Sequence, residues 1–360
     1  MLDISLHGVS FAFPGFALRG IGLTFPRSTH TAIIGPPGSG ASTLLRLITG
    51  YLRPDEGSIH IGARAVERIK QSARPILAVP EQVPARWSVQ HALVAAVRQR
   101  TLDRIDRHRE YELAVQKWRL APILDRKIAT LSTSEALVVQ LARIELLRPG
   151  IVVADRLFTG ANPALLSWAP DEIYRALRVM GTTIVSSPAA TTELGWADRV
   201  VALNAGAVVQ QGSPSKLFSE PLDESVAAAT GDVNLIPVRI RGRNVESMIG
   251  NWELEHPPFE GTGVALARPD DFSVARPGED SDLIFGVEEA AFQEGRWMAR
   301  GILSGGFMLR VTLPRATEIH KGKLLALRYD PLRFSLISRN IAFETSGAPL
   351  DAMPPMRETR

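Results

Sequence analysis

The chain has 360 residues, 45% of them hydrophobic and 22% charged, and carries a formal net charge of +3. This length allows two or three domains with cores of their own, and the composition excludes a disordered or fibrous chain. The basic residues are scattered, so the sequence does not predict a nucleic-acid partner. With no cysteine, disulfides and cysteine nucleophiles are excluded. Residues 1–11 lack signal-peptide character and no apolar run approaches the ~20 residues that cross a bilayer, so we expect a cytoplasmic protein.

The first 50 residues predict strands followed by a glycine-rich loop and a helix. Residues 2–13 and 18–25 have strand character, and 30–35 is a short apolar run. GPPGSGAST at 35–43 follows this run, and residues 42–50 then have apolar positions at helical spacing. A strand, a glycine loop and a helix in this order are typical of a phosphate-binding loop.

The loop departs from the pattern G-x-x-x-x-G-K-[ST] at one position. Gly35, Gly40 and Ser42 match it, but Ala41 stands where the lysine is expected. The backbone amides and the helix N-terminus still predict an anion site. A glycine-rich turn after a strand is also common without any ligand, so the loop alone leaves both interpretations open.

The next segments alternate between strand and helix. A hairpin-like run at 57–62 and a buried-strand candidate at 75–82 precede a mostly helical stretch at 88–148. The alternation predicts an α/β domain whose mostly parallel sheet is covered on both faces. The later strand candidates are 151–155, 182–186 and 198–203, with a turn at 204–207.

Beyond residue 230 the helical period disappears, and short apolar runs alternate with Gly, Pro and acidic turns. This pattern predicts a small barrel or sandwich of strands. We therefore divide the chain into an α/β domain at 1–231 with a helical subdomain at about 86–148, an all-β domain at 232–345, and a loose tail at 346–360.

Four segments after the loop carry a family resemblance through their order and spacing along the chain. They are LSTSEALVVQLARIELLRP (131–149), IVVAD (151–155), TTIVSSP (182–188) and ADRVVALNAGAVVQQGSP (197–214). Together with the loop they resemble the ATP-binding subunit of an ABC transporter, of the kind in binding-protein-dependent importers. The segment beginning ALARPDDF resembles the regulatory (OB/TOBE-like) domain of ATPases for sugars, polyols, glycerol phosphate and polyamines.

The resemblance implies sites for ATP and Mg²⁺. Phe13 would stack on adenine, although core packing is the alternative; the Q-loop glutamine falls on Glu81, with Gln82 one place on. Ser42 and Asp155 would contact the metal, although Asp155 could instead pair with Arg156 or with a nearby backbone amide. The implied nucleotide-binding residues are Phe13, Gly35, Pro36, Pro37, Gly38, Ser39, Gly40, Ala41, Ser42, Thr43, Glu81, Gln82 and Asp155, and the signature residues facing a partner's nucleotide are Ser132, Thr133, Ser134 and Glu135.

Several positions depart from the family pattern. Ala41 replaces the lysine, LSTSE replaces LSGGQ, Arg156 replaces the catalytic glutamate, and the switch histidine falls on Ser187. The D-loop aspartate falls on Asn162. Losing a general base costs typically about 10² to 10⁴ in rate, so we expect ATP binding to be weakened and hydrolysis at this site to be lost. Ser132 and Glu135 also fit the S-x-x-E capping box, which explains LSTSE without a nucleotide.

These departures predict a non-hydrolysing subunit of an importer for a small solute, with a sugar or a polyol such as glycerol as the expected class. Its implied partners are a competent second ATPase chain in a heterodimer, membrane permease subunits and, indirectly, a solute-binding protein. It would lie on the inner face of the cell membrane. Two alternatives remain: an active but unorthodox ATPase, and a cytosolic regulator derived from one.

Overall fold

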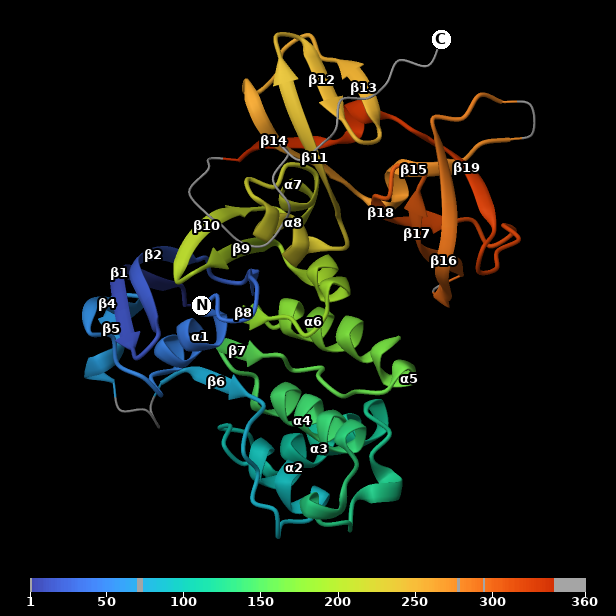
Figure 1. Ribbon diagram of the computed structural model, residues 1–360. Coiled ribbons are helices and arrows are strands. Elements are labelled where there is room, and N and C mark those ends of the chain that lie inside the picture. The colour runs from blue at the N-terminus through green and yellow to red at the C-terminus, as the bar shows by residue number, and fades with distance from the viewer. Residues whose placement is uncertain (1, 70–73, 277–278, 294, 340–360) are drawn as a thin grey trace, which may run out of the picture. The chain divides into compact units, whose positions relative to one another are not determined.

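The computed structural model describes residues 2–69, 74–276, 279–293 and 295–339 (Figure 1). The chain divides into two compact units, the first ending at Asp232 and the second beginning at Val233. The tail expected at 346–360 lies outside the described residues.

The first unit is built on a six-stranded sheet in the order β10-β9-β3-β8-β7-β6. Its strands are parallel except β10, which runs antiparallel to β9, so the predicted mostly parallel sheet is confirmed. The strand expected at 75–82 ends earlier, because Pro80 has no N–H to donate to a neighbouring strand. The strands are β3 (His30–Ile34), β6 (Ile76–Val79), β7 (Ile151–Asp155), β8 (Thr183–Ser187), β9 (Arg199–Asn204) and β10 (Ala207–Gly212).

These central strands are apolar throughout because both faces of the sheet are buried. In β7, Ile151 and Val153 pack into one hydrophobic cluster, whereas Val152 and Ala154 pack into another on the opposite face. Side chains alternate along a strand, so each face takes every second residue. This two-sided burial fixes the ends of the strands, where the loops that carry polar residues begin.

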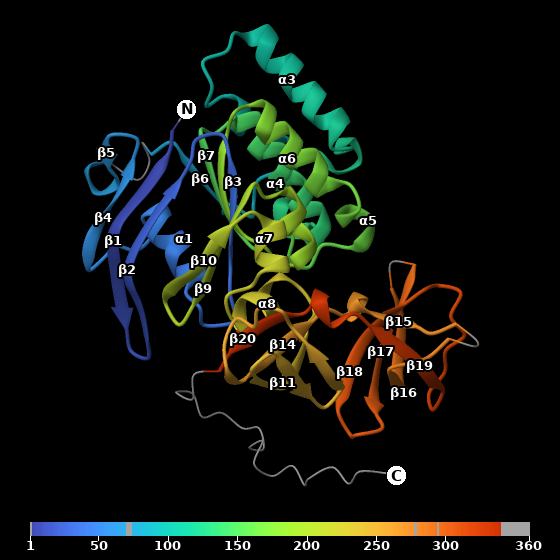
Figure 2. The same cartoon turned by 90° about the horizontal axis from the view of Figure 1, so that it is seen from above.

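Helix α1 (Ala41–Thr49) lies between this sheet and a second, antiparallel sheet in the order β2-β1-β4-β5 (Figure 2). Its buried leucines and isoleucine share one cluster with residues of both sheets. Gly50 ends the helix with φ 77°, a left-handed conformation that glycine adopts without strain. The second sheet consists of β1 (Ile4–Phe13), β2 (Phe16–Phe25), β4 (Glu56–Ile61) and β5 (Arg64–Ala65).

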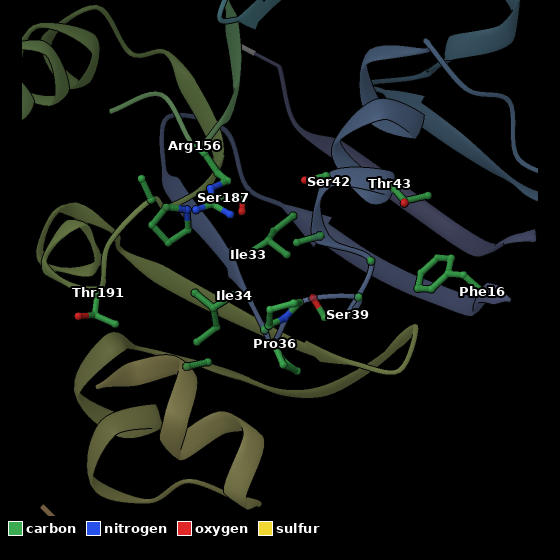
Figure 3. A pocket seen from close by; sticks show the side chains of 18 of the residues that line it. Phe16, Ile33, Ile34, Pro36, Ser39, Ser42, Thr43, Arg156, Ser187 and Thr191 are labelled. Atoms are coloured by element: carbon green, nitrogen blue, oxygen red, sulfur yellow. The ribbon is translucent and has the colours of Figure 1, made fainter. Parts of the chain in front are cut away.

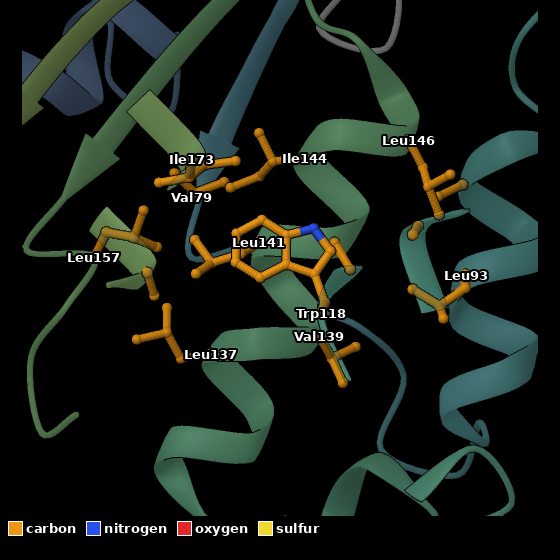
Figure 4. Close-up of a cluster of buried hydrophobic side chains, with 14 of the residues drawn as sticks. Val79, Leu93, Trp118, Leu137, Val139, Leu141, Ile144, Leu146, Leu157 and Ile173 are labelled. Atoms are coloured by element: carbon orange, nitrogen blue, oxygen red, sulfur yellow. The ribbon is translucent and has the colours of Figure 1, made fainter. Parts of the chain in front are cut away.

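The stretch predicted to be mostly helical contains three α-helices: α2 (Val89–Val97), α3 (Arg104–Lys117) and α4 (Thr133–Leu147). Each begins at a capping residue whose side chain accepts a backbone N–H from the first turn; these residues are Ser88, Asp103 and Ser132 respectively. Their apolar faces pack around Trp118, which is fully buried (Figure 4). The other described α-helices of the first unit are α5 (Pro163–Leu166), α6 (Ala169–Val179), α7 (Pro214–Ser219) and α8 (Glu224–Thr230).

In the second unit the described residues form two five-stranded antiparallel sheets. Burial alternates along β11 at every second residue, as expected for a sheet with one face on the core. The small all-β domain predicted from short apolar runs is therefore present. One sheet contains β11 (Asn234–Arg241), β12 (Asn244–Ser247), β13 (Gly250–Glu253), β14 (Gly261–Ala267) and β20 (Ser335–Ser338); the other contains β15 (Phe272–Val274), β16 (Leu283–Gln293), β17 (Arg296–Leu303), β18 (Met308–Leu313) and β19 (Leu324–Tyr329).

Candidate nucleotide site

The loop between β3 and α1 forms a cradle. Gly40 has φ 103°, and a Cβ there would lie 2.6 Å from Cζ of Phe16, so glycine is required both by conformation and by space. No side chain caps the N-terminus of α1, and its first turn contains no acidic residue. The first amides of the helix therefore point into open space with the positive end of the helix dipole, which suits a phosphate group.

A cavity of about 650 Å³ opens above this loop (Figure 3). All loop residues predicted to bind nucleotide, from Gly35 to Thr43, line it. The opposite wall comes from the ends of β7 and β8 and from the residues after them, which are distant in sequence. These residues are Arg156, Ser187, Pro188, Ala189, Ala190 and Thr191.

Phe13 also lines this cavity, at the end of β1. Its side chain is 49% exposed, so the alternative that Phe13 is a core residue is wrong. Phe16, which the sequence analysis did not select, lies opposite Phe13 in the β1–β2 register, with ring centroids 5.1 Å apart. Pro14 and Gly15 form a two-residue turn, and that signal could have placed the two rings side by side. The two rings offer an aromatic surface on which the adenine ring of a nucleotide could stack.

Among the described residues that line the cavity, Arg156 alone carries a charged side chain. Its backbone has φ 51°, and its N–H donates to the carbonyl of Ser187 at 2.8 Å. Within the described residues its guanidinium makes no ion pair and no side-chain hydrogen bond, so the expected alternative of a pair with Asp155 is absent. In Figure 3 the side chain extends beside Ser187 toward the middle of the cavity.

Asp155 lines a different cavity, of about 580 Å³, together with Arg46, Tyr51, Glu81 and Gln82. Its Oδ1 is buried without a hydrogen-bond partner among the described residues, as a cation-binding oxygen would be. Ser42, its predicted partner in metal binding, lines the cradle instead. No carboxylate lies in the described lining of the cradle, so the residues there do not fit a magnesium ion.

Glu81, the residue at the Q-loop position, is held by helix α4. Its backbone N–H donates to Oε1 of Gln140 at 3.1 Å, and its carboxylate accepts from Nη2 of buried Arg143 at 2.7 Å. Glu81 and Gln82 also line a third hollow, of about 320 Å³, whose other wall includes Val83, Ile128, Ala136, Val139 and Gln140. Both predicted Q-loop residues thus line two neighbouring hollows and not the cradle.

The four signature residues lie at the N-terminus of α4, where the predicted capping box is present. Glu135 Oε2 accepts the Ser132 N–H at 2.7 Å and its hydroxyl at 2.9 Å, and Arg126 contacts Oε1 at 2.6 Å. The Ser132 N–H bond and the hydroxyl bond lower the pKa of Glu135, with a further contribution from Arg126. Ser134 accepts the N–H of Asn162 at 3.0 Å, and Thr133 is exposed. The N–H and hydroxyl of Ser132 and the N–H of Glu135 are therefore used within the chain itself.

The parallel sheet, the glycine cradle at the N-terminus of α1 and the separate helical subdomain define a P-loop nucleotide-binding protein of the cassette type. The family model described as ABC transporter matches residues 18–158. The chain is 30% identical over 240 residues to an sn-glycerol-3-phosphate import ATP-binding protein of Rhizobium meliloti, covering 65% of this chain and 69% of that one. It belongs to the ABC transporter family of ATP-binding proteins.

Two further comparisons agree with this assignment. An Fe(3+) ions import ATP-binding protein of Pseudomonas fluorescens is 28% identical over 282 residues, with 76% of this chain and 79% of that protein covered. The solved structure of an ATP-binding subunit of an ABC transporter shares the fold with a TM-score of 0.54 at 21% identity, covering 60% of this chain and 91% of that one. None of the described helices is both long and apolar enough to cross a membrane.

Proposed function

We propose that this chain is a non-hydrolysing ATP-binding subunit of an ABC importer. The observation that carries the proposal is the cradle: it keeps the loop, the helix N-terminus and the aromatic pair, but its described lining contains a guanidinium and no carboxylate. The loop amides would hold the phosphates, and Phe13 with Phe16 would pack on the base. A water beside the terminal phosphate would find no base to take its proton.

A buried acidic residue, Glu193, lies behind the far wall of the cavity and does not fill this role. Glu193 is 6% exposed, and its carboxylate accepts the amides of Ala189 at 2.7 Å and Ala190 at 3.1 Å. Burial raises the pKa of Glu193, and the two amides and Arg156 oppose this change. Its role is to fix the loop that forms the wall of the cavity, and it is not part of the described lining.

We expect purified chain to bind ATP and to show no turnover above background. A general base contributes typically about 10² to 10⁴ in rate, and this cradle also lacks the family's lysine. Calorimetry measures binding, and phosphate release measures turnover. The matched control is the Asp155→Asn variant, which must leave any residual rate unchanged. Turnover that disappears in this variant would contradict the proposal and support an active, unorthodox ATPase.

The capping box within the signature residues, between Ser132 and Glu135, supports a heterodimer with a competent ATPase chain. In a homodimer each site would combine a cradle without lysine and an α4 N-terminus already capped by Glu135. ATP would then be hydrolysed at the phosphate-binding loop of the partner, which would face the LSTSE segment of this chain. The complex would lie on the inner face of the cell membrane, with permease subunits above it and a solute-binding protein acting through them.

The two hollows along Glu81 and Gln82 are the proposed contact with the permease, and we expect Val83→Asp to abolish co-purification with permease subunits from native membranes. A buried charge without a partner costs more than such a contact gains. Trp87 is not among the residues that line these two hollows, and its ring packs at a tilt on that of His91. Leu113→Asp, an exposed position on α3, is the control. Retention of the permease by Val83→Asp would contradict docking at this place.

For the solute we propose a sugar or a polyol derivative such as a glycerol phosphate. The support is the name of the Rhizobium meliloti relative, which specifies sn-glycerol-3-phosphate import. The same native complex tests this assignment, since its solute-binding protein can be assayed directly with labelled glycerol 3-phosphate. Binding of iron in place of glycerol phosphate would contradict it.

A further inference from the structure

We infer that Arg156 supplies the positive charge of the cradle, and that the cradle holds nucleotide phosphates without a magnesium ion. This inference rests on the proposed ATP binding and adds the residue and the ionic form of the ligand. It starts from the position of Arg156 at the carboxyl end of β7, across the cavity from Ala41.

The backbone of Arg156 is fixed, so the direction of its side chain is set by the fold. Its N–H donates to the Ser187 carbonyl at 2.8 Å, and its own carbonyl accepts the N–H of Thr159 at 3.1 Å. The first bond ties it to the end of β8 and the second closes a turn. A left-handed φ of 51° at a non-glycine residue persists only when surrounding contacts hold it.

The guanidinium is also available. The described residues offer it no ion pair and no side-chain hydrogen bond, although it influences buried Glu193 electrostatically. A guanidinium keeps its charge at every physiological pH and presents donors in a planar fork that matches two phosphate oxygens. Arg156 therefore offers what the absent lysine would supply, from the opposite wall.

The same arrangement disfavours magnesium in the cradle. The carboxylate that would hold the ion, Asp155, lines the other cavity, and the only oxygen ligands in the described lining of the cradle are hydroxyl and backbone carbonyl groups. A divalent ion would also lie near the Arg156 guanidinium and the positive end of the α1 dipole, both of which repel it. Neutralisation of the phosphates then falls to Arg156 and the loop amides.

The test is calorimetric titration of the purified full chain with ATP, in EDTA and again with excess Mg²⁺. We expect the wild type to bind in EDTA, and Mg²⁺ to leave the affinity unchanged or to weaken it by withdrawing free ATP. Arg156→Ala should weaken binding about 10- to 150-fold, the range for a hydrogen bond to a charged group. Arg156→Lys should lose less, and Arg27→Ala, an exposed position outside the cavity lining, should lose nothing.

A rescue variant separates loss of charge from loss of fold. Ala41→Lys in the Arg156→Ala background returns the charge from the loop, and we expect it to restore most of the affinity. Equal binding by wild type and Arg156→Ala, or a tenfold gain from Mg²⁺, overturns this inference and leaves the proposed ATP binding intact. If the wild type binds no ATP in either condition, the proposed function fails together with it.

Discussion

Replacing Trp118 by alanine is expected to lower the free energy of unfolding by about 3 to 5 kcal/mol, the range for removing a large aromatic side chain from a core. Trp118 is 1% exposed and packs among the helices of the subdomain. Its indole Nε1 donates to Glu145 Oε2 at 2.7 Å, and its ring lies 5.7 Å from that of Trp168. Since native domains are stable by only about 5 to 15 kcal/mol, this loss is a large fraction of the total.

Urea unfolding followed by circular dichroism at 222 nm measures the change, because the described α-helices all lie in the first unit. Trp118→Phe is the matched control: it keeps an aromatic ring in the core and removes the hydrogen bond to Glu145, so we expect a smaller loss. A cost below about 1 kcal/mol for Trp118→Ala would show that the helical subdomain does not depend on this packing.

Acidification is expected to destabilise the protein through His30 by roughly 3 kcal/mol, at 1.36 kcal/mol per pKa unit. Burial lowers the pKa of His30 from 6.5 to about 4, a shift that its hydrogen bond to Trp196 and the charge of Asp198 partly oppose. The unfolded chain therefore binds a proton between pH 6.5 and about 4 where the folded chain does not. The contribution of His30 to the free energy of unfolding is fully present above pH 6.5 and is lost as the pH falls toward 4.

The contacts of His30 explain why it stays neutral. Its Nδ1 lies 3.0 Å from the Trp196 carbonyl, which can only accept, so Nδ1 carries the proton and Nε2 accepts from the Ser186 hydroxyl at 2.7 Å. The ring also stacks on Tyr174 at 4.6 Å. Protonation of Nε2 would make it a donor, so the Ser186 hydroxyl could no longer donate to it and would have to rotate.

The measurement compares urea unfolding of the wild type and of His30→Gln at pH 7 and pH 4.5. Glutamine keeps a polar side chain but does not titrate, so the variant should lose less stability between the two pH values than the wild type. The variant is less stable at pH 7, which does not affect this difference. Identical pH dependence in both proteins would show that His30 does not cause the acid sensitivity.

Local patterns predicted the cradle well because its signals are contiguous. The strand before Gly35, the helix up to Thr49 and the glycine at its end follow from apolar spacing and backbone conformation within about 20 residues. The capping box of Ser132 and Glu135 is equally local. For the same reason, the two-residue turn at Pro14 and Gly15 was available as a signal for the second aromatic residue.

Relations between distant segments were less accessible. Ser42 and Asp155 are 113 positions apart, and only the packing of α1 against β7 decides that they line different cavities. Arg156 was recognised from the sequence as the residue in place of the catalytic glutamate, and its position in the cradle depends on what the ends of β7 and β8 place around it. Propensities describe neighbours in the chain and not side chains that meet across a sheet.

The bonds between Glu81 and the helical subdomain have a mechanical consequence. Gln140 holds the backbone of Glu81 on both its N–H and its carbonyl, and Arg143 holds the side chain while also donating to the Ala92 carbonyl on α2. We expect a displacement of this loop to displace α4 and α2 as well, because several hydrogen bonds would have to break before the loop could move alone. Ser132 and Glu135 lie at the N-terminus of α4, so the residues that hold Glu81 belong to the same helix as the signature segment, and we expect the two to move together whatever the cradle contains.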